Sequence, residues 1–394
     1  MSAFRSESER PLRILLVGDY DDDPRLGSAK VSYKLREELR AAGHQCDALF
    51  SNDLGRRPSD RQVRQLVAPV LAAGAIARAL SRQPYDIVDA ASAEGLWFGV
   101  RKRLGAWRET ALVCRSNGIE HLNYRRMIDD SDAGVLAKAW TRRLWYPASR
   151  LSQVAAAARV ADRLLVLNEV DRRFAIDRHW QPPERIDVVL HGVSDRFLTD
   201  HDVAPKRGAG VLFCGAWDYV KGTTYLVAAF RQLVEHGHPV PLTILGSGLP
   251  AHVVLAAFPE HVRPLVTVAD RVPEDRVVAE YRRHDLLVFP STYEGFGLVV
   301  LEAMSQGLPV VATPVGCVPV LVQDGVTGTL VPPRDSTALA GAIARLMSFP
   351  DERARLGARA IAAVRGLTWR KTAARTIEVY EKALASPGRS RGRA

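Results

Sequence analysis

The stretch PSTYEGFGLVVLEAMSQGLPVVATPVG, residues 290–316, decides the fold of this chain. It follows directly on a short apolar run, Leu286–Phe289, and leads through a glycine-containing loop into an apolar helical stretch that ends at Gly307. A second apolar run, Val310–Ala312, comes next. Short apolar runs bounded by turn residues are typical of buried parallel strands. The stretch therefore predicts a strand, a loop, a helix and a second strand.

The same order of elements opens each half of the chain. Residues 12–17 form an apolar run, a polar loop reaches Gly27, and an amphipathic helix follows with Ser28 as its predicted N-cap. In the second half Val211–Cys214 is the apolar run, and its loop ends at Gly222. Such alternation predicts an α/β protein with doubly wound parallel sheets.

The chain length of 394 residues predicts two domains, because one hydrophobic core rarely grows beyond about 300 residues. Residues 201–210, HDVAPKRGAG, mix proline, glycine and charge and are the predicted linker. We expect an N-terminal domain over residues 1–200 and a C-terminal domain over 205–370. Residues 387–394 are expected to be a basic, disordered tail.

The composition excludes several classes of protein. The net charge of +10 indicates anionic ligands, but no zinc-finger spacing or RNA-recognition motif is present, so nucleic-acid binding is not predicted. Walker, Gly-x-Ser-x-Gly and His-Glu-x-x-His motifs are also missing. The four cysteines are isolated, which favours a reducing compartment. The N-terminal residues lack an apolar signal segment, and the apolar run at 66–77 is short. We expect a cytoplasmic protein, at most peripheral on the inner face of a membrane.

One segment, residues 138–173, holds eight basic residues against three acidic ones, together with Trp140, Trp145 and Tyr146. Such a segment is more often a helix with a solvated face. The functional alternative is a hypothesis: contact with an anionic membrane surface, where aromatic rings and basic side chains sit together.

The chemistry of residues 290–316 lies in two glutamates and the glycines between them. Glu294 precedes Gly295-Phe296-Gly297, and Glu302 lies in the helix that follows. The first amides of that helix have no acceptor within it and suit an anionic group. A helical separation of about 12 Å is too long for a glycosidase carboxylate pair. The two glutamates fit the ends of one long ligand, such as a nucleoside diphosphate sugar.

These residues resemble the retaining glycosyltransferases of family 4. The resemblance rests on Glu294-x7-Glu302 with its glycines, on the Gly-x-Pro-Val-Val sequence at 307–311, and on Lys221-Gly222. It covers most of the second half of the chain, with further matches at Gly-Ser-Gly 246–248, Asp324 and the helix from Trp369. In the first half the resemblance rests mainly on the order of strands and helices and on the Gly27 loop.

The resemblance implies a GT-B architecture, in which two Rossmann-like domains face each other across a cleft. It implies that the C-terminal domain binds the donor and that the last helix, residues 372–386, crosses back to the N-terminal domain. Neither a metal nor a cofactor is expected. A UDP- or GDP-sugar would be the co-substrate.

The resemblance also assigns roles in the C-terminal domain. Glu294 would contact the transferred sugar and Glu302 the ribose, while Lys221 would steady the departing diphosphate. The donor would also meet main-chain atoms at Gly215, Gly295, Phe296, Gly297 and Leu298. One departure is clear, because Ala216 and Trp217 stand where the family usually has an arginine after the strand glycine.

In the N-terminal domain, Gly27 matches the family's loop glycine near the diphosphate. Residues 115–121, RSNGIEH, match a segment that often presents a histidine to the sugar, but Asn117 stands at that position. Asn117 and His121 are the candidates for the sugar or acceptor side, and His121 is as readily a structural residue.

The sequence therefore predicts a retaining, metal-independent glycosyltransferase. Its acceptor would be a saccharide, a lipid-linked molecule or another small molecule, in polysaccharide, glycolipid or glycoconjugate biosynthesis. One alternative is a GT-B nucleotide-sugar epimerase. A second is a non-catalytic nucleotide-sugar-binding protein, which Ala216 and Asn117 favour. The oligomeric state is left open.

Overall fold

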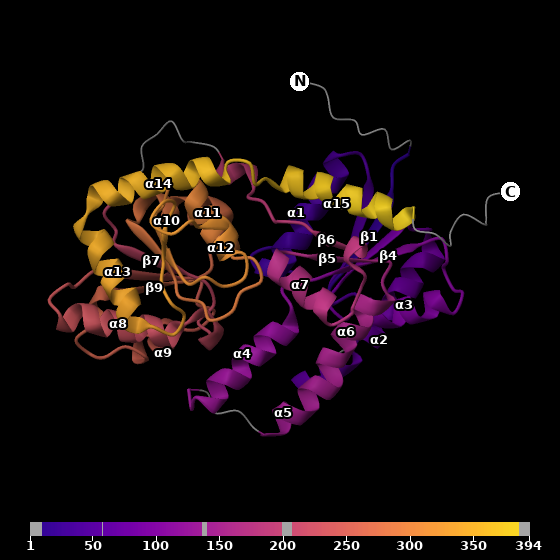
Figure 1. The fold of residues 1–394 in the computed structure, drawn as a ribbon, viewed down its shortest axis with the longest axis horizontal. Coiled ribbons are helices and arrows are strands. Elements are labelled where there is room, and N and C mark those ends of the chain that lie inside the picture. The colour runs from indigo at the N-terminus through magenta and orange to yellow at the C-terminus, as the bar shows by residue number, and fades with distance from the viewer. Residues whose placement is uncertain (1–9, 57, 136–139, 199–206, 386–394) are drawn as a thin grey trace. The chain divides into compact units, whose positions relative to one another are not determined.

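The computed structural model describes residues 10–56, 58–135, 140–198 and 207–385. They form two compact units (Figure 1). Unit 1 lies within Met1–Leu190 and Trp369–Ala394, and unit 2 is His191–Thr368. The tail predicted at 387–394 lies outside the described residues.

Unit 1 is built on six parallel strands in the order β2-β1-β3-β4-β5-β6. The strands are β1 (Arg13–Val17), β2 (Gln45–Leu49), β3 (Ile87–Ala91), β4 (Ala111–Arg115), β5 (Arg163–Val166) and β6 (Ile186–Val188). The helices are α1 (Gly27–Ala41), α2 (Arg61–Arg82), α3 (Leu96–Arg103), α4 (Glu120–Asp132), α5 (Trp140–Tyr146), α6 (Ser152–Val160), α7 (Glu169–Asp177) and α15 (Trp369–Leu384), and a π-helical turn, η1 (Pro147–Leu151), joins α5 to α6.

Helices cover both faces of this sheet because its central strands are apolar on both sides. Ala72 of α2, Phe98 of α3 and Ala157 of α6 are buried against one face. Leu35 of α1 and Tyr380 of α15 are buried against the other. This is the arrangement expected for a doubly wound parallel sheet.

Unit 2 repeats the plan with six parallel strands in the order β12-β11-β10-β7-β8-β9. The strands are β7 (Val211–Cys214), β8 (Leu242–Leu245), β9 (Val266–Ala269), β10 (Leu286–Phe289), β11 (Val310–Ala312) and β12 (Thr329–Leu330). The helices are α8 (Thr223–Glu235), α9 (Ala251–Ala256), α10 (Glu274–Arg283), α11 (Leu298–Ser305), α12 (Val318–Leu321), α13 (Ser336–Ser348) and α14 (Pro350–Val364). Apolar side chains of α8 and α13 form the main core with the sheet.

The strands predicted at Val211–Cys214, Leu286–Phe289 and Val310–Ala312 are confirmed at those bounds. The predicted cap of the first helix is wrong. Helix α1 begins at Gly27, one residue before Ser28, and its N-cap is Leu26, which makes no side-chain cap. Lys30 N already donates to Leu26 O at 2.7 Å, so Ser28 lies inside the first turn.

The boundary between the units lies after Leu190, not near residue 200 as the linker composition suggested. Val193 forms a parallel bridge with Thr368. Phe197 is buried, and its ring centroid lies 6.1 Å from that of Tyr281. These long-range contacts place residues 191–198 in unit 2, and local composition does not reveal them.

The chain returns to unit 1 at α15, and a buried polar cluster holds this helix. Tyr380 Oη donates to Asp89 Oδ2 at 2.6 Å, and the same carboxylate accepts from Arg115 Nη2 at 2.5 Å. All three side chains are buried. Burial and the neighbouring carboxylate raise the pKa of Tyr380 well above its ordinary value, so the hydroxyl remains a donor. The cluster ties the last helix to β3 and β4.

Tyr380→Phe is expected to lower the free energy of unfolding of unit 1 by about 1.5–3 kcal/mol, the usual contribution of a hydrogen bond to a charged group. Urea denaturation followed by tyrosine and tryptophan fluorescence measures the change. Tyr33→Phe, which removes an exposed hydrogen bond from a hydroxyl of α1 to the Asp22 carboxylate, is the control. Equal midpoints for both variants and the wild type would contradict the role of this cluster.

Helix α2 meets the length and composition of a membrane span. Among the described residues it is the one helix that does so, over Gln62–Arg82, with a mean hydropathy of 1.4 and 33% of its window buried. Its buried side includes Ala72 and Ile76, which pack into the core of unit 1.

Candidate active site

The sheet of unit 2 has a switch point between β7 and β10. From β7 the chain moves to β8 and β9 on one side and then returns to β10 on the other side. In open parallel sheets, ligands bind at such a point, outside the carboxyl ends of the strands. The loop after β7 carries Gly215 and Lys221, and the loop after β10 carries Glu294 and Gly297. The topology thus brings together the two loops that the sequence singled out.

An ion pair joins these loops. Lys221 Nζ lies 2.5 Å from Glu294 Oε2, and the two side chains are 29% and 20% exposed. Glu294 Oε1 accepts from the Gly295 amide at 3.1 Å. A partly buried pair is screened less by salt than a surface pair. The lysine is therefore held at the switch point, where an anionic ligand would compete with Glu294 for it.

Main-chain contacts fix the same two loops. Gly222 follows Lys221 with φ +73°, and a Cβ atom built there would lie 1.9 Å from Pro290 O. The Thr292 amide donates to Val220 O at 2.8 Å. Only glycine allows this approach without displacing the loop. The two residues of the ion pair therefore belong to loops that main-chain contacts hold together.

Helix α11 starts at this point. Gly297 is its N-cap with φ +92°, and Leu298 is its first residue. The opening amides of a helix have no acceptor within it, so they present positive partial charge. The Phe296 side chain is buried and packs on His191, with ring centroids 4.9 Å apart, so only its backbone can meet a ligand. A Cβ on Gly316 would lie 2.4 Å from Glu294 O, so a further glycine supports this loop.

Glu302 lies one turn farther along α11 and is 6% exposed. Tyr281 Oη of α10 donates to Glu302 Oε2 at 3.1 Å. A lone glutamate in a helix is usually exposed to solvent, but Glu302 is buried. Sequence reasoning missed Tyr281, because no motif links it to a carboxylate on the next helix.

The sequence departure after Gly215 has a structural reason. The Trp217 ring packs against Phe213 and Phe258, with centroids 6.1 and 5.8 Å away, so it belongs to the core and not to a charged clamp. A basic side chain lies at the same edge of the sheet. Arg271, after β9, lies against the glycine loop after β8, and a Cβ on Gly248 would be 3.2 Å from its Nη2.

The predicted first-half residues all lie in unit 1. Gly27 is exposed at the start of α1, and a Cβ built there would meet nothing within 4 Å. The protein would therefore leave room for a side chain at position 27, and the backbone there is open to a ligand.

Asn117 and His121 follow β4. Asn117 Oδ1 is buried and has no hydrogen-bond partner within the described part of the chain. The His121 ring lies against Trp180 and Phe174, with centroids 4.8 and 5.8 Å away. Burial lowers the pKa of His121 to about 4, so the imidazole is neutral at pH 7. These contacts favour the structural interpretation of His121.

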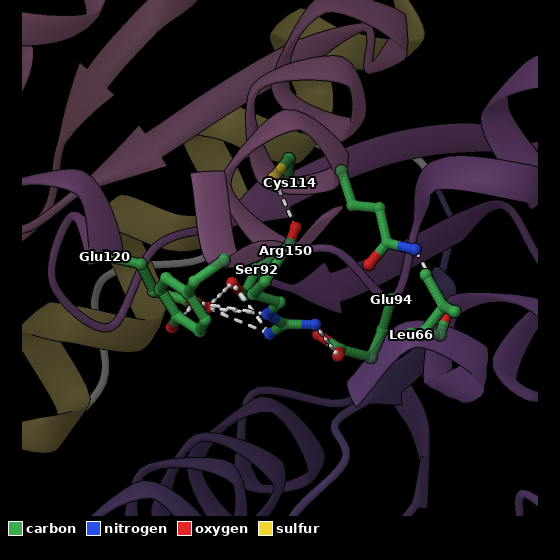
Figure 2. A network of polar contacts seen from close by, with 8 residues as sticks. Leu66, Ser92, Glu94, Cys114, Glu120 and Arg150 are labelled. Carbon is green, nitrogen blue, oxygen red and sulfur yellow. Dashed lines mark hydrogen bonds and ion pairs between the residues drawn. The ribbon is translucent and has the colours of Figure 1, made fainter. Parts of the chain in front are cut away.

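A partly buried cluster at the carboxyl edge of unit 1 was not predicted. Figure 2 shows the Arg150 guanidinium between the carboxylates of Glu120 and Glu94, at 2.9 and 3.1 Å. Ser92, with φ +51°, donates to Glu120 Oε1 at 2.5 Å. Burial raises the pKa of Glu94, although Arg150 opposes the effect. The cluster fixes the π-helical turn η1 to the ends of β3 and β4.

The basic side chains of segment 138–173 are less available for contact with an anionic membrane than the composition of the segment suggests. Lys138 lies outside the described residues, and nothing is described of the Trp140 side chain. Several of its arginines pair with carboxylates, namely Arg143 with Asp132, Arg150 with Glu94 and Glu120, Arg163 with Asp187, and Arg172 with Glu169. The membrane hypothesis stays a prediction.

Residues 208–348 match the family model described as Glycosyl transferases group 1. The matched residues all lie within unit 2. Both loops of the switch point, with Lys221 and Glu294, lie inside the matched residues.

Two curated relatives show a further similarity to this chain. A D-inositol 3-phosphate glycosyltransferase of Streptomyces scabiei is 33% identical over 267 residues, which cover 63% of this chain and 60% of that protein. The protein of the same name from Nocardia farcinica is 32% identical over 240 residues, which cover 57% and 53% of the two chains. The chain thus spans between half and two thirds of the length of these relatives.

Solved structures match both units. Sucrose-phosphate synthase from Thermosynechococcus elongatus is 22% identical, with a TM-score of 0.74 over 94% of this chain and 99% of that one. Anabaena HepE in complex with UDP is 18% identical, with a TM-score of 0.65 over 94% and 100%. At such identities the likeness shows the fold alone. The predicted GT-B fold class, with two Rossmann-like parallel-sheet domains, is confirmed.

Proposed function

We propose that this chain is a retaining, metal-independent glycosyltransferase. It transfers a sugar from a nucleoside diphosphate sugar bound by unit 2 to a hydroxyl group of an acceptor bound by unit 1. The observation that carries the proposal is the Lys221–Glu294 pair beside the start of α11, at the switch point of the unit 2 sheet. The group 1 domain match supports it.

The donor's diphosphate would displace Glu294 from Lys221, because two phosphates compete well for an ammonium group. Lys221 and the first amides of α11 would then neutralise the charge that grows on the leaving group. Glu294, released from the pair, would contact the transferred sugar. Glu302 would accept a ribose hydroxyl, and Gly215 and Gly27 would leave room for backbone contact.

The reaction would proceed on one face of the sugar. The bond from the anomeric carbon to the diphosphate oxygen breaks as the acceptor oxygen bonds to the same carbon from the same side, so the configuration is retained. The leaving diphosphate takes the acceptor's proton, and no protein base is assigned. His121, with its pKa of about 4, would be a weak base at neutral pH.

The first donor and acceptor to test come from the similar proteins. HepE has also been solved in complex with UDP-glucose, and D-inositol 3-phosphate is in the name of the curated relatives. We therefore place UDP-glucose first among donors and include D-inositol 3-phosphate beside neutral saccharides among acceptors. The proposed setting is cytoplasmic carbohydrate biosynthesis.

The proposal is tested in two stages. Thermal unfolding is measured with UDP-, GDP- and ADP-glucose, since a bound donor raises stability by mass action. The stabilising donor is then incubated with the acceptors in the presence and absence of EDTA, and products are identified by mass spectrometry and NMR. Sugar transfer with retention in EDTA supports the proposal. Epimerised donor would favour the epimerase, and stabilisation without any product the non-catalytic binding protein.

Glu302→Ala is expected to raise the dissociation constant of the free nucleoside diphosphate about 10- to 100-fold, the range for one hydrogen bond to a charged group. Turnover at saturating donor should change less. Calorimetric titration with the diphosphate of the stabilising donor gives the constant. Glu235→Ala, which removes an exposed carboxylate of α8 paired with Arg231, is the control. An unchanged constant in Glu302→Ala would contradict the ribose role.

A further inference from the structure

A tyrosine behind the donor site has a contact that core packing alone does not explain. Tyr281, on α10, is fully buried, and its hydroxyl bonds to another side chain. It donates to Glu302 Oε2 at 3.1 Å, across to a different helix. Cys214, the last residue of β7, also lies within hydrogen-bonding reach of the Tyr281 side chain. Side chains from α11 and β7 therefore meet at the Tyr281 hydroxyl of α10.

The protonation of this tyrosine defines the direction of the hydrogen bond. Burial, with Cys214 and Glu302 nearby, raises the pKa of Tyr281 well above its ordinary value. The phenol is thus an O–H group at every working pH, and Glu302 is the acceptor. A carboxylate has two oxygens, and a donor fixed on one of them restricts the rotation of the whole group.

The hydrogen bond from Tyr281 matters for ligand binding because of where the Glu302 carboxylate lies. Glu302 belongs to α11, whose first turn lies at the switch point. Gly215, next to Cys214, has no atom within 4 Å of the place where its Cβ would be. The open backbone at Gly215 and the carboxylate of Glu302 are therefore linked through Cys214 and Tyr281. A side chain that must meet a ligand hydroxyl binds better when its rotamer is already fixed.

We propose that Tyr281 is a positioning residue of the donor site, which holds the Glu302 carboxylate so that it accepts a ribose hydroxyl of the nucleoside diphosphate. This inference rests on the proposed function. It adds a residue that never touches the donor and acts only through Glu302. It also implies that Tyr281 contributes to the recognition of ribose and not of the phosphates.

The experiment compares nucleotides with and without ribose hydroxyls. Calorimetric titrations use UDP, GDP, ADP and their 2′,3′-dideoxy counterparts on the full chain. The wild type is expected to bind one ribonucleotide at least 10-fold more tightly than its dideoxy counterpart. In Tyr281→Phe this ratio should fall to within about threefold, while the affinity for the dideoxy nucleotide stays within about twofold of the wild type. Tyr85→Phe is the matched control, because the Tyr85 hydroxyl donates to the Asp47 carboxylate at 2.8 Å in unit 1.

A merely structural role has a different signature. It would weaken the ribonucleotide and the dideoxy nucleotide by the same factor and leave the ratio at its wild-type value, which would overturn the inference. Wild-type protein that binds neither UDP nor GDP, nor ADP in the same assay, would instead overturn the proposed function. The two failures are therefore distinct.

A second pair of variants keeps the test valid if Tyr281→Phe does not fold. Glu302→Met and the double variant Tyr281→Phe/Glu302→Met leave no buried charge without its donor, so both avoid that penalty. With no oxygen in the side chain at position 302, Tyr281 has nothing to position, and the two variants should show ratios within about twofold of each other. A further severalfold loss in the double variant would overturn the inference, because Tyr281 would then act independently of Glu302.

Discussion

Lys221→Ala is expected to lower turnover about 100- to 1,000-fold, the range observed when one preorganised group that stabilises developing charge is removed. The ammonium group is fixed 2.5 Å from Glu294 on a loop that main-chain contacts hold, so it needs little rearrangement to meet the leaving diphosphate. The dissociation constant of the free nucleoside diphosphate should rise much less, about 10-fold, since the charge grows mainly in the transition state.

Steady-state kinetics with the stabilising donor, together with calorimetry on its diphosphate, separate the two effects. Lys382→Ala is the control. It removes an ammonium group on the last helix, α15, which pairs with Asp187 of β6. Its turnover should match that of the wild type. Wild-type-like turnover in Lys221→Ala would remove the leaving-group role, and equal losses in affinity and turnover would reduce Lys221 to a binding residue.

Gly222→Ala is expected to abolish activity and to lower the free energy of unfolding of unit 2 by about 2–5 kcal/mol. The left-handed backbone of residue 222 costs an L-residue about 1–2 kcal/mol, and overpacking adds about 1–3 kcal/mol. A Cβ atom there would lie 1.9 Å from Pro290 O, so the loops after β7 and β10 must separate. That movement also separates Lys221 from Glu294.

Urea denaturation and the transfer assay measure both effects, and the chain offers a matched control. Gly237, after α8, has φ +78° but nothing within 4 Å of a built Cβ. Gly237→Ala should therefore lower the free energy of unfolding only by the cost of the left-handed backbone, about 1–2 kcal/mol. This variant should retain activity. Similar losses in the two variants would show that the contact with Pro290 is unimportant.

Much of the fold is readable from the sequence because parallel strands buried on both faces are continuous apolar runs. Val211–Cys214 and Leu286–Phe289 were predicted at their observed bounds for this reason. The first helix shows the limit of local signals. Ser28 has the right chemistry for a cap, but α1 starts at Gly27, and the cap position falls on Leu26.

The domain boundary and the support of the site depend on contacts between distant residues. Val193 joins unit 2 by pairing with Thr368, which no local pattern reveals. Lys221 and Glu294 were identified because each belongs to a glycine-rich loop motif. Tyr281 and Arg150 were not, since their carboxylate partners lie on other elements and no short spacing connects them.

The central claim is that the β7–β10 edge of unit 2 binds the diphosphate of a nucleotide sugar. It is tested most directly by a crystal structure of the protein with the nucleoside diphosphate that stabilises it most. We expect phosphate oxygens within hydrogen-bonding distance of Lys221 Nζ and the first amides of α11, a ribose hydroxyl on Glu302, and a Lys221–Glu294 pair that has opened. A nucleotide bound elsewhere, with that pair still closed, would contradict it.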